Sequence, residues 1–141
     1  MGWNNSHLHS FTIGDSLYGM QLDDYPDEEL NERDFTVTKV LPEGMRCFQY
    51  EYDFGDSWEH EVLVEDVSFS SPALKFGVCI DGQGACPPED VGGIPGYAQF
   101  LEAIADPLHE EHDNYLVWVG HKFDPAAFDL AAANAALQRV R

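Results

Sequence analysis

The strongest chemical candidate in this sequence is the segment DFGDSWEH at residues 53–60, where two aspartates precede a histidine. A turn at 55–57 would let the Asp53 and Asp56 carboxylates converge with the His60 imidazole, beside Trp58. Carboxylate oxygens and a histidine nitrogen are suitable ligands for a metal ion that activates water for hydrolysis. The alternative is structural, because turn aspartates commonly bond backbone amides, and His60 would then be a polar strand residue.

Two further histidines, His7 and His9, alternate in the segment HLHSFTI. On a strand both imidazoles would share one face and could serve as a two-nitrogen platform for a divalent metal ion. Half-buried histidines that bond neighbouring carboxylates would explain the spacing equally well. The candidate metal ligands are therefore His7, His9, Asp56 and His60.

The segment 81–96 is so rich in glycine and proline that we predict an ordered loop with no regular element. Its candidate functional residues, with the cysteine just before it, are Cys79, Asp81, Cys86, Glu89 and Asp90. The spacing of the two cysteines is not that of a structural zinc site, which favours a structural role for both thiols. Three cysteines in all predict a reduced, cytoplasmic protein.

The composition excludes several classes of function. A formal net charge of −19 argues against direct binding to a nucleic-acid backbone or to an anionic membrane surface. The longest apolar run, 115–119, is too short to span a bilayer. No phosphate-binding loop, dinucleotide fingerprint or serine-nucleophile motif is present. A soluble protein with a protein partner is the first expectation, and mimicry of nucleic acid by the acidic surface is a weaker one.

Hydrophobic periodicity predicts a single α+β domain over residues 1–141, with strands first and helices later. The antiparallel sheet would be built on a central aromatic hairpin and covered by C-terminal helices. Strands are predicted at 7–13, 48–54, 58–69 and 76–80, and helices at 97–104, 108–119 and 130–140. The segment 35–41 fits a strand or a helical turn, and the acidic segment 23–34 fits a solvated loop. Gly14–Asp15 fits a turn, Asp124–Pro125 fits a helix start, and Asp129 fits the cap of the last helix.

Alternation of aromatic and β-branched residues on the hairpin also predicts the core. The predicted core residues are Phe48, Tyr50, Tyr52, Phe54, Val62 and Val64, packed under helices that carry Phe100, Leu101, Ile104 and Leu116.

Four motifs in order along the chain resemble the plasmid pRiA4b ORF-3-like family. They are MGWNNSHLHSF at the start, YEYDFGDSWEH, CIDGQGACPPEDVGG, and GY followed by FDPAAFDL. The resemblance implies little chemistry, because this family has no established activity. Some relatives are encoded on plasmids or insertion elements, which implies a possible association with mobile genetic elements.

The chain departs from the family pattern in two ways. Val91 stands where the family usually has a third loop cysteine. Family members also have two strands and a helix before the motif that here begins at Met1. The resemblance therefore implies an N-terminally incomplete domain whose sheet has an unpaired edge. We expect a homodimer that closes this edge around Trp3, Phe11 and Ile13, or else a fragment of low stability.

Overall fold

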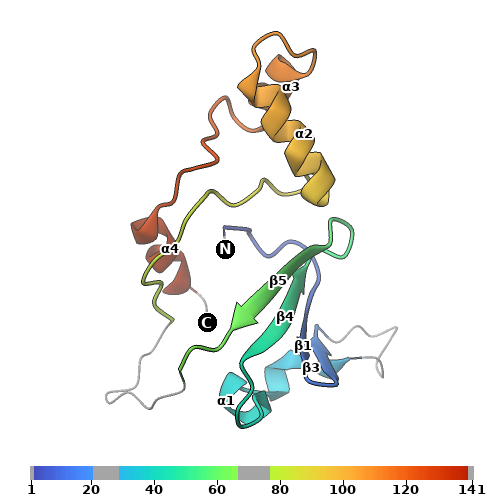
Figure 1. The fold of residues 1–141 in the computed structure, drawn as a ribbon, viewed down its shortest axis with the longest axis vertical. Helices are drawn as coiled ribbons and strands as arrows, with labels where there is room; N and C mark the ends of the chain where they lie inside the picture. The colour runs from blue at the N-terminus through green and yellow to red at the C-terminus, as the bar shows by residue number, and fades with distance from the viewer. Residues whose placement is uncertain (1, 21–28, 67–76, 140–141) are drawn as a thin grey trace. The chain divides into compact units, whose positions relative to one another are not determined.

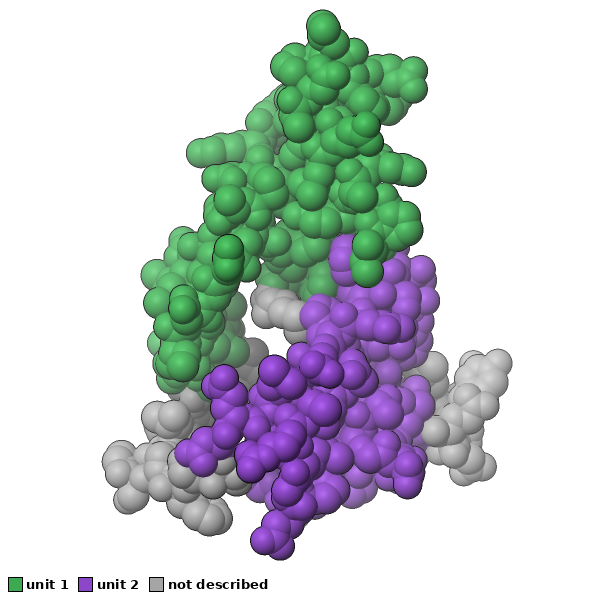
Figure 2. Space-filling model, viewed as in Figure 1, with its two compact units in different colours: residues 1–4, 68–141 green, residues 5–67 purple. Residues whose placement is uncertain are grey.

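A computed structural model describes residues 2–20, 29–66 and 77–139, and forms two compact units (Figures 1 and 2). Unit 1 comprises residues 1–4 and 68–141, and unit 2 comprises residues 5–67. Unit 2 holds strands β1 (His9–Ile13), β2 (Ser16–Gly19), β3 (Leu30–Asn31), β4 (Cys47–Tyr52) and β5 (Trp58–Leu63), the 3-10 helix η1 (Glu32–Asp34) and helix α1 (Val37–Val40). Unit 1 holds helices α2 (Gly93–Ala105), α3 (His112–Trp118) and α4 (Leu130–Leu137).

The five strands form one mixed sheet in the order β3-β2-β1-β4-β5. Every pairing is antiparallel except β2 with β3, which is parallel. The predicted α+β class with a mostly antiparallel sheet is confirmed. The β4–β5 hairpin is not central, however, because β1 occupies the middle of the sheet and β5 lies at one end.

The hairpin separates two kinds of side chain onto the two faces of the sheet. Tyr52 pairs with Trp58, Tyr50 with His60 and Phe48 with Val62, so one face is aromatic and apolar. Residues at alternate positions of the same strands form the other face, which carries Gln49, Glu51, Glu59 and Glu61. We call Glu51, Glu59 and Glu61 the acidic face. This separation follows from the period-2 geometry of a strand.

The core of unit 2 is smaller than the alternation predicts. Tyr52 is 1% exposed and Trp58 and Ile13 are also buried, whereas Phe48, Tyr50, Val62 and Val64 are half-buried. Phe54 was predicted to be core and is 44% exposed. The strand ends at Tyr52 because Asp53 has a φ of 57°, which turns the chain and takes Phe54 out of the alternation.

Strand β1 begins at His9, two residues later than predicted, and is paired on both sides, with β2 and with β4. The N-terminal sheet edge predicted to be open around Phe11 and Ile13 is therefore occupied. Strand β2 was not predicted, although its turn at Gly14–Asp15 was. The homodimer expected around Trp3, Phe11 and Ile13 stays a prediction.

The core of unit 1 is an aromatic cluster around Phe100 of α2, which is fully buried. Its neighbours are Tyr97, Tyr115, Trp118 and Phe123. Leu101, Ile104 and Leu116 are half-buried. The hairpin and these helices belong to different units, and the packing predicted between them stays a prediction.

Several predicted helix boundaries are wrong. Helix α2 begins at Gly93, inside the segment predicted to be an irregular loop, and Pro95 lies in its first turn, where a missing amide costs little. Helix α3 begins only at His112, and Leu108 is 92% exposed. No helix starts at Asp124, whose carboxylate instead accepts the amide of Ala126 in a turn.

Other predicted elements agree with the structure only in part. The Asp129 carboxylate accepts the amide of Ala132 as the predicted cap of α4, which ends at Leu137 rather than near residue 140. The ambiguous segment 35–41 contains the helical turn α1. Strand β5 ends at Leu63, and residues 77–80 form no strand. Residues 67–76 and 21–28, which include parts of other predicted elements, lie outside the described residues.

The acidic segment 23–34 was predicted to be a solvated loop. In its described part, residues 30–34 instead form β3 and η1. Across the described ranges, no helix is long and apolar enough to cross a membrane.

Candidate functional site

Asp53 organises the turn that joins β4 to β5. One carboxylate oxygen, Oδ1, accepts the amide of Gly55 at 3.0 Å and faces the amide of Asp56 at 3.4 Å. The backbone carbonyl of Asp53 accepts the amide of Ser57, and its own amide donates to the carbonyl of Leu8. Aspartate suits this position because it tolerates positive φ and can bond the amides two or three residues ahead.

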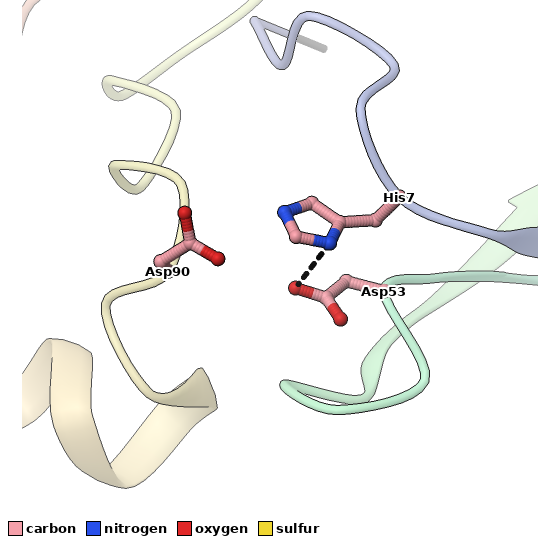
Figure 3. A group of neighbouring side chains, drawn as sticks. All are labelled: His7, Asp53 and Asp90. Atoms are coloured by element: carbon pink, nitrogen blue, oxygen red, sulfur yellow. Dashed lines mark ion pairs between the residues drawn. The ribbon is translucent and has the colours of Figure 1, made fainter.

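The second oxygen of the same carboxylate faces His7 (Figure 3). His7 Nδ1 lies 3.6 Å from Asp53 Oδ2, and the imidazole packs edge-on against the ring of Tyr52. His7 precedes β1 rather than lying in it, so it does not share the strand face of His9. The pair joins the entry of β1 to the hairpin turn. Asp90, also drawn in Figure 3, belongs to unit 1.

The other residues of the DFGDSWEH segment take separate positions. Trp58 is buried at the start of β5, opposite Tyr52. His60 Nδ1 donates to the carbonyl of Tyr50 at 3.2 Å, and its ring lies tilted against the Tyr50 ring on the aromatic face. Asp56 lies in the turn and is partly exposed. Convergence of Asp53, Asp56 and His60 on one ion stays a prediction.

His9 is engaged by a carboxylate that the sequence did not point to. Its Nε2 lies 2.9 Å from Glu32 Oε2 in η1, and its Nδ1 is buried without a hydrogen-bond partner in the described ranges. Since a carboxylate only accepts, Nε2 is the donor of this hydrogen bond. Burial, followed by the neighbouring Tyr52 and Glu32, raises the pKa of the Tyr50 phenol beside this pair.

Two of the four candidate metal ligands lie beside different carboxylates, His7 beside Asp53 and His9 beside Glu32. In the part of the chain that the structure describes, none of His9, Asp56 and His60 belongs to a group of three ligand atoms within 4.8 Å of one another. The alternative of half-buried histidines bonded to carboxylates describes His9 with Glu32, whereas His7 and Asp53, 3.6 Å apart, are too distant for a hydrogen bond.

The glycine- and proline-rich loop of unit 1 is fixed at several points. Trp3 Nε1 donates to the carbonyl of Pro87 at 3.0 Å, and the amide of Asn4 donates to the Glu89 carboxylate at 2.8 Å. Asp81 accepts the amide of Gly82 through its side chain, and Asp90 is an exposed residue with a φ of 57°. These contacts give the loop its order.

The loop cysteines differ in surroundings. Cys86 is half-buried, and a Cβ on Gly2 would meet Cys86 Cβ at 2.7 Å, so glycine permits this close approach. Burial raises the pKa of the Cys86 thiol, which disfavours the thiolate needed for a nucleophile or a metal ligand. Cys79 is fixed by Asn134 of α4, which bonds both its amide and its carbonyl at 2.9 Å. Both environments are typical of structural thiols.

Val91 is 8% exposed, so an apolar side chain fills the position where the resemblance implied a third cysteine.

The comparisons with known proteins identify a family. The family model of the plasmid pRiA4b ORF-3-like proteins matches residues 1–132. The chain belongs to the plasmid pRiA4b ORF-3-like family. It is 38% identical over 139 residues to the uncharacterized protein y4hQ of Sinorhizobium fredii, covering 97% of this chain and 71% of that protein.

One solved structure has the same fold. It is the crystal structure of protein MM3350, of unknown function, from Methanosarcina mazei Go1. The two share a TM-score of 0.82 and 30% identity, over 94% of this chain and 75% of that one. The family and the fold are therefore established together, and the function must be argued from the site.

The turn built on Asp53 gives a direct prediction. Asp53→Ala is expected to lower the free energy of unfolding by about 1–3 kcal/mol, because it removes the turn acceptor and places a Cβ without a capping group at positive φ. Asp53→Asn should retain most of the stability, since asparagine tolerates that φ and keeps an acceptor oxygen. Urea titration of the three proteins measures this. Equal losses in both variants would show that the charge toward His7 matters more than the turn.

Proposed function

We propose that this protein is a non-enzymatic binding module whose acidic face contacts a cationic surface of a protein partner. The observation that supports it is the register of the hairpin, in which Glu51 lies directly opposite Glu59. Like charges in that position destabilise a sheet. Ser57 donates to Glu51 and compensates it only in part. A cationic partner would neutralise a repulsion that the isolated sheet tolerates.

The surroundings of these carboxylates support the same proposal. Glu59 and Glu61 are exposed, and no strand of the sheet contains a lysine or an arginine. The strands fix the backbone positions of these residues, so a partner would have to order only their side chains on binding.

The test uses two matched double variants of the full chain. Glu59→Gln with Glu61→Gln removes two charges from the acidic face, and Glu102→Gln with Glu110→Gln removes two exposed charges from unit 1. We expect the first to weaken binding to 20-residue polylysine roughly three- to tenfold more than the second, because each exposed charge pair contributes about 0.2–1 kcal/mol. Equal weakening would mean that only net charge attracts the peptide.

One of these substitutions should weaken binding but increase stability. Glu59→Gln alone is expected to raise the free energy of unfolding by about 0.2–1 kcal/mol, because it relieves the repulsion with Glu51. A variant that is more stable and binds less tightly would indicate that the carboxylate is kept for binding.

The alternative is a metal-dependent hydrolase that uses Asp53, Asp56 and His60 with His7 and His9. It receives less support, because Asp53 shapes the turn and His60 bonds the Tyr50 carbonyl. Measuring the content of Zn, Mn and Fe in purified, untagged protein, before and after dialysis against each ion, tests it. Stoichiometric metal, lost in Asp56→Asn, would favour this alternative. Association with mobile genetic elements stays an expectation from the family.

A further inference from the structure

The terminal strand of the sheet, β5, has one side that is paired with β4 and one side that is not (Figure 1). Val64 donates its amide to the carbonyl of Arg46, which continues the hairpin register by one pair. In an antiparallel ladder the hydrogen-bonded pairs alternate. Val62 and His60 therefore also bond across to β4, whereas the residues between them direct their backbone groups the other way.

The opposite strand gives an independent check of this alternation. Asp53 donates its amide to Leu8, in line with the β1–β4 register, so the odd-numbered residues of β4 bond to β1 and the even-numbered ones to β5. The amides of Glu61 and Leu63 consequently point away from the sheet. Within the ranges 2–20, 29–66 and 77–139 no strand pairs with that side of β5, and neither amide donates a hydrogen bond to the backbone of a turn or loop. Such a row of backbone groups is a template for an added strand.

The side chains along β5 define what such a strand would carry. On one face Glu59 and Glu61 are exposed, and Leu63 follows them at 64% exposure. On the other face lie Trp58, His60 and Val62. Directly opposite residues of neighbouring strands interact, so a strand beside β5 gains most from lysine or arginine at one set of alternate positions and apolar residues at the other.

A second copy of this chain fits the edge poorly. Two-fold antiparallel pairing of β5 with itself about His60 places Glu59 against Glu61 of the other copy. Pairing about Glu61 places the two Glu61 side chains opposite each other. Both arrangements oppose like charges, and each chain carries a net charge of −19.

We propose that the free edge of β5 takes up an extended segment of a basic partner protein, in which lysine or arginine alternates with apolar residues, as a sixth strand of the sheet. The inference rests on the proposed function and adds the mode of binding. Backbone hydrogen bonds to Glu61 and Leu63 would set the register, and the acidic face would select the basic residues.

The test uses a labelled octapeptide of alternating lysine and valine and a second octapeptide that is N-methylated at the residues facing β5. Methylation removes the backbone donors and keeps the charge and the side chains. With full-length protein we expect the methylated peptide to bind about tenfold more weakly in fluorescence anisotropy, as for the loss of two hydrogen bonds. Equal binding of both peptides would overturn strand addition and leave the proposed cationic contact in place.

A pair of protein variants tests the same bonds from the other side. Leu63→Pro removes an outward amide without breaking the ladder to β4, because proline is tolerated on an edge strand when its nitrogen faces outward. It should weaken binding about tenfold, whereas Leu63→Ala should bind within about twofold of the original protein. Should Leu63→Pro fail to fold, as judged by circular dichroism, the methylated peptide still decides.

Two other outcomes would overturn the proposal. One is no binding of the lysine–valine peptide even at low salt. The other is a dimer in light scattering that Leu63→Pro converts to a monomer, because a second copy would then be the occupant. The proposed function would still be judged by its own pair of charge variants.

Discussion

Replacing Phe100 by alanine is expected to lower the free energy of unfolding of unit 1 by about 3–5 kcal/mol, the usual range for removing a buried aromatic ring. The ring is fully buried and lies 5.1–5.8 Å, between centroids, from the rings of Phe123, Tyr115 and Trp118. Its loss leaves a cavity that four other rings cannot fill without leaving their positions.

Urea unfolding followed by tryptophan fluorescence measures this effect, because Trp118 touches the deleted ring. Leu108→Ala is the matched control, since Leu108 is 92% exposed and should change stability by less than about 0.5 kcal/mol. Unchanged stability of the Phe100 variant would show that α2 buries a different face.

The second large effect is expected at Tyr52, where alanine should lower the stability of unit 2 by about 3–5 kcal/mol. The side chain is 1% exposed, stands between His9 and Trp58 in the sheet register, and contacts His7 edge-on. Its hydroxyl also accepts the amide of Ser6 at 3.2 Å.

Tyr52→Phe separates the ring from the hydroxyl and should cost only about 1 kcal/mol, the net value of one hydrogen bond. The buried Trp58 gives the fluorescence signal for this unit. If the phenylalanine variant were as unstable as the alanine variant, the bond to Ser6 rather than ring packing would dominate.

Local patterns in the sequence were sufficient to predict the hairpin strands and the cap of α4. Phe48, Tyr50 and Tyr52 alternate over several residues, and Asp129 precedes an alanine-rich run, so each signal lies within a few positions. Strands β2 and β3 escaped prediction because SLYG and LN are too short to show a period. Helix α2 begins before its predicted start because its first turn contains glycine and proline, which favour a loop prediction, although proline is acceptable in the first turn of a helix.

The sequence predicted which histidines belong to the site but not which carboxylates lie beside them. The sequence singled out both His7 and His9, and the structure contains a hydrogen bond to a carboxylate for His9 and a longer contact with one, at 3.6 Å, for His7. Their partners lie far away in the chain, at Asp53 and Glu32, and no spacing rule connects residues separated by an irregular segment. Asn134, which bonds Cys79 across 55 positions, escaped for the same reason.

The path of the chain through the two units has a consequence for the order of folding. Residues 2–4 belong to unit 1, and the bond from Trp3 to Pro87 spans 84 positions that include all of unit 2. Closing so long a loop in an unstructured chain is entropically costly, whereas β1–β2 and β4–β5 close over a few residues. We therefore expect the sheet to form first, during synthesis, and the N-terminal residues to dock only after the glycine-rich loop has left the ribosome.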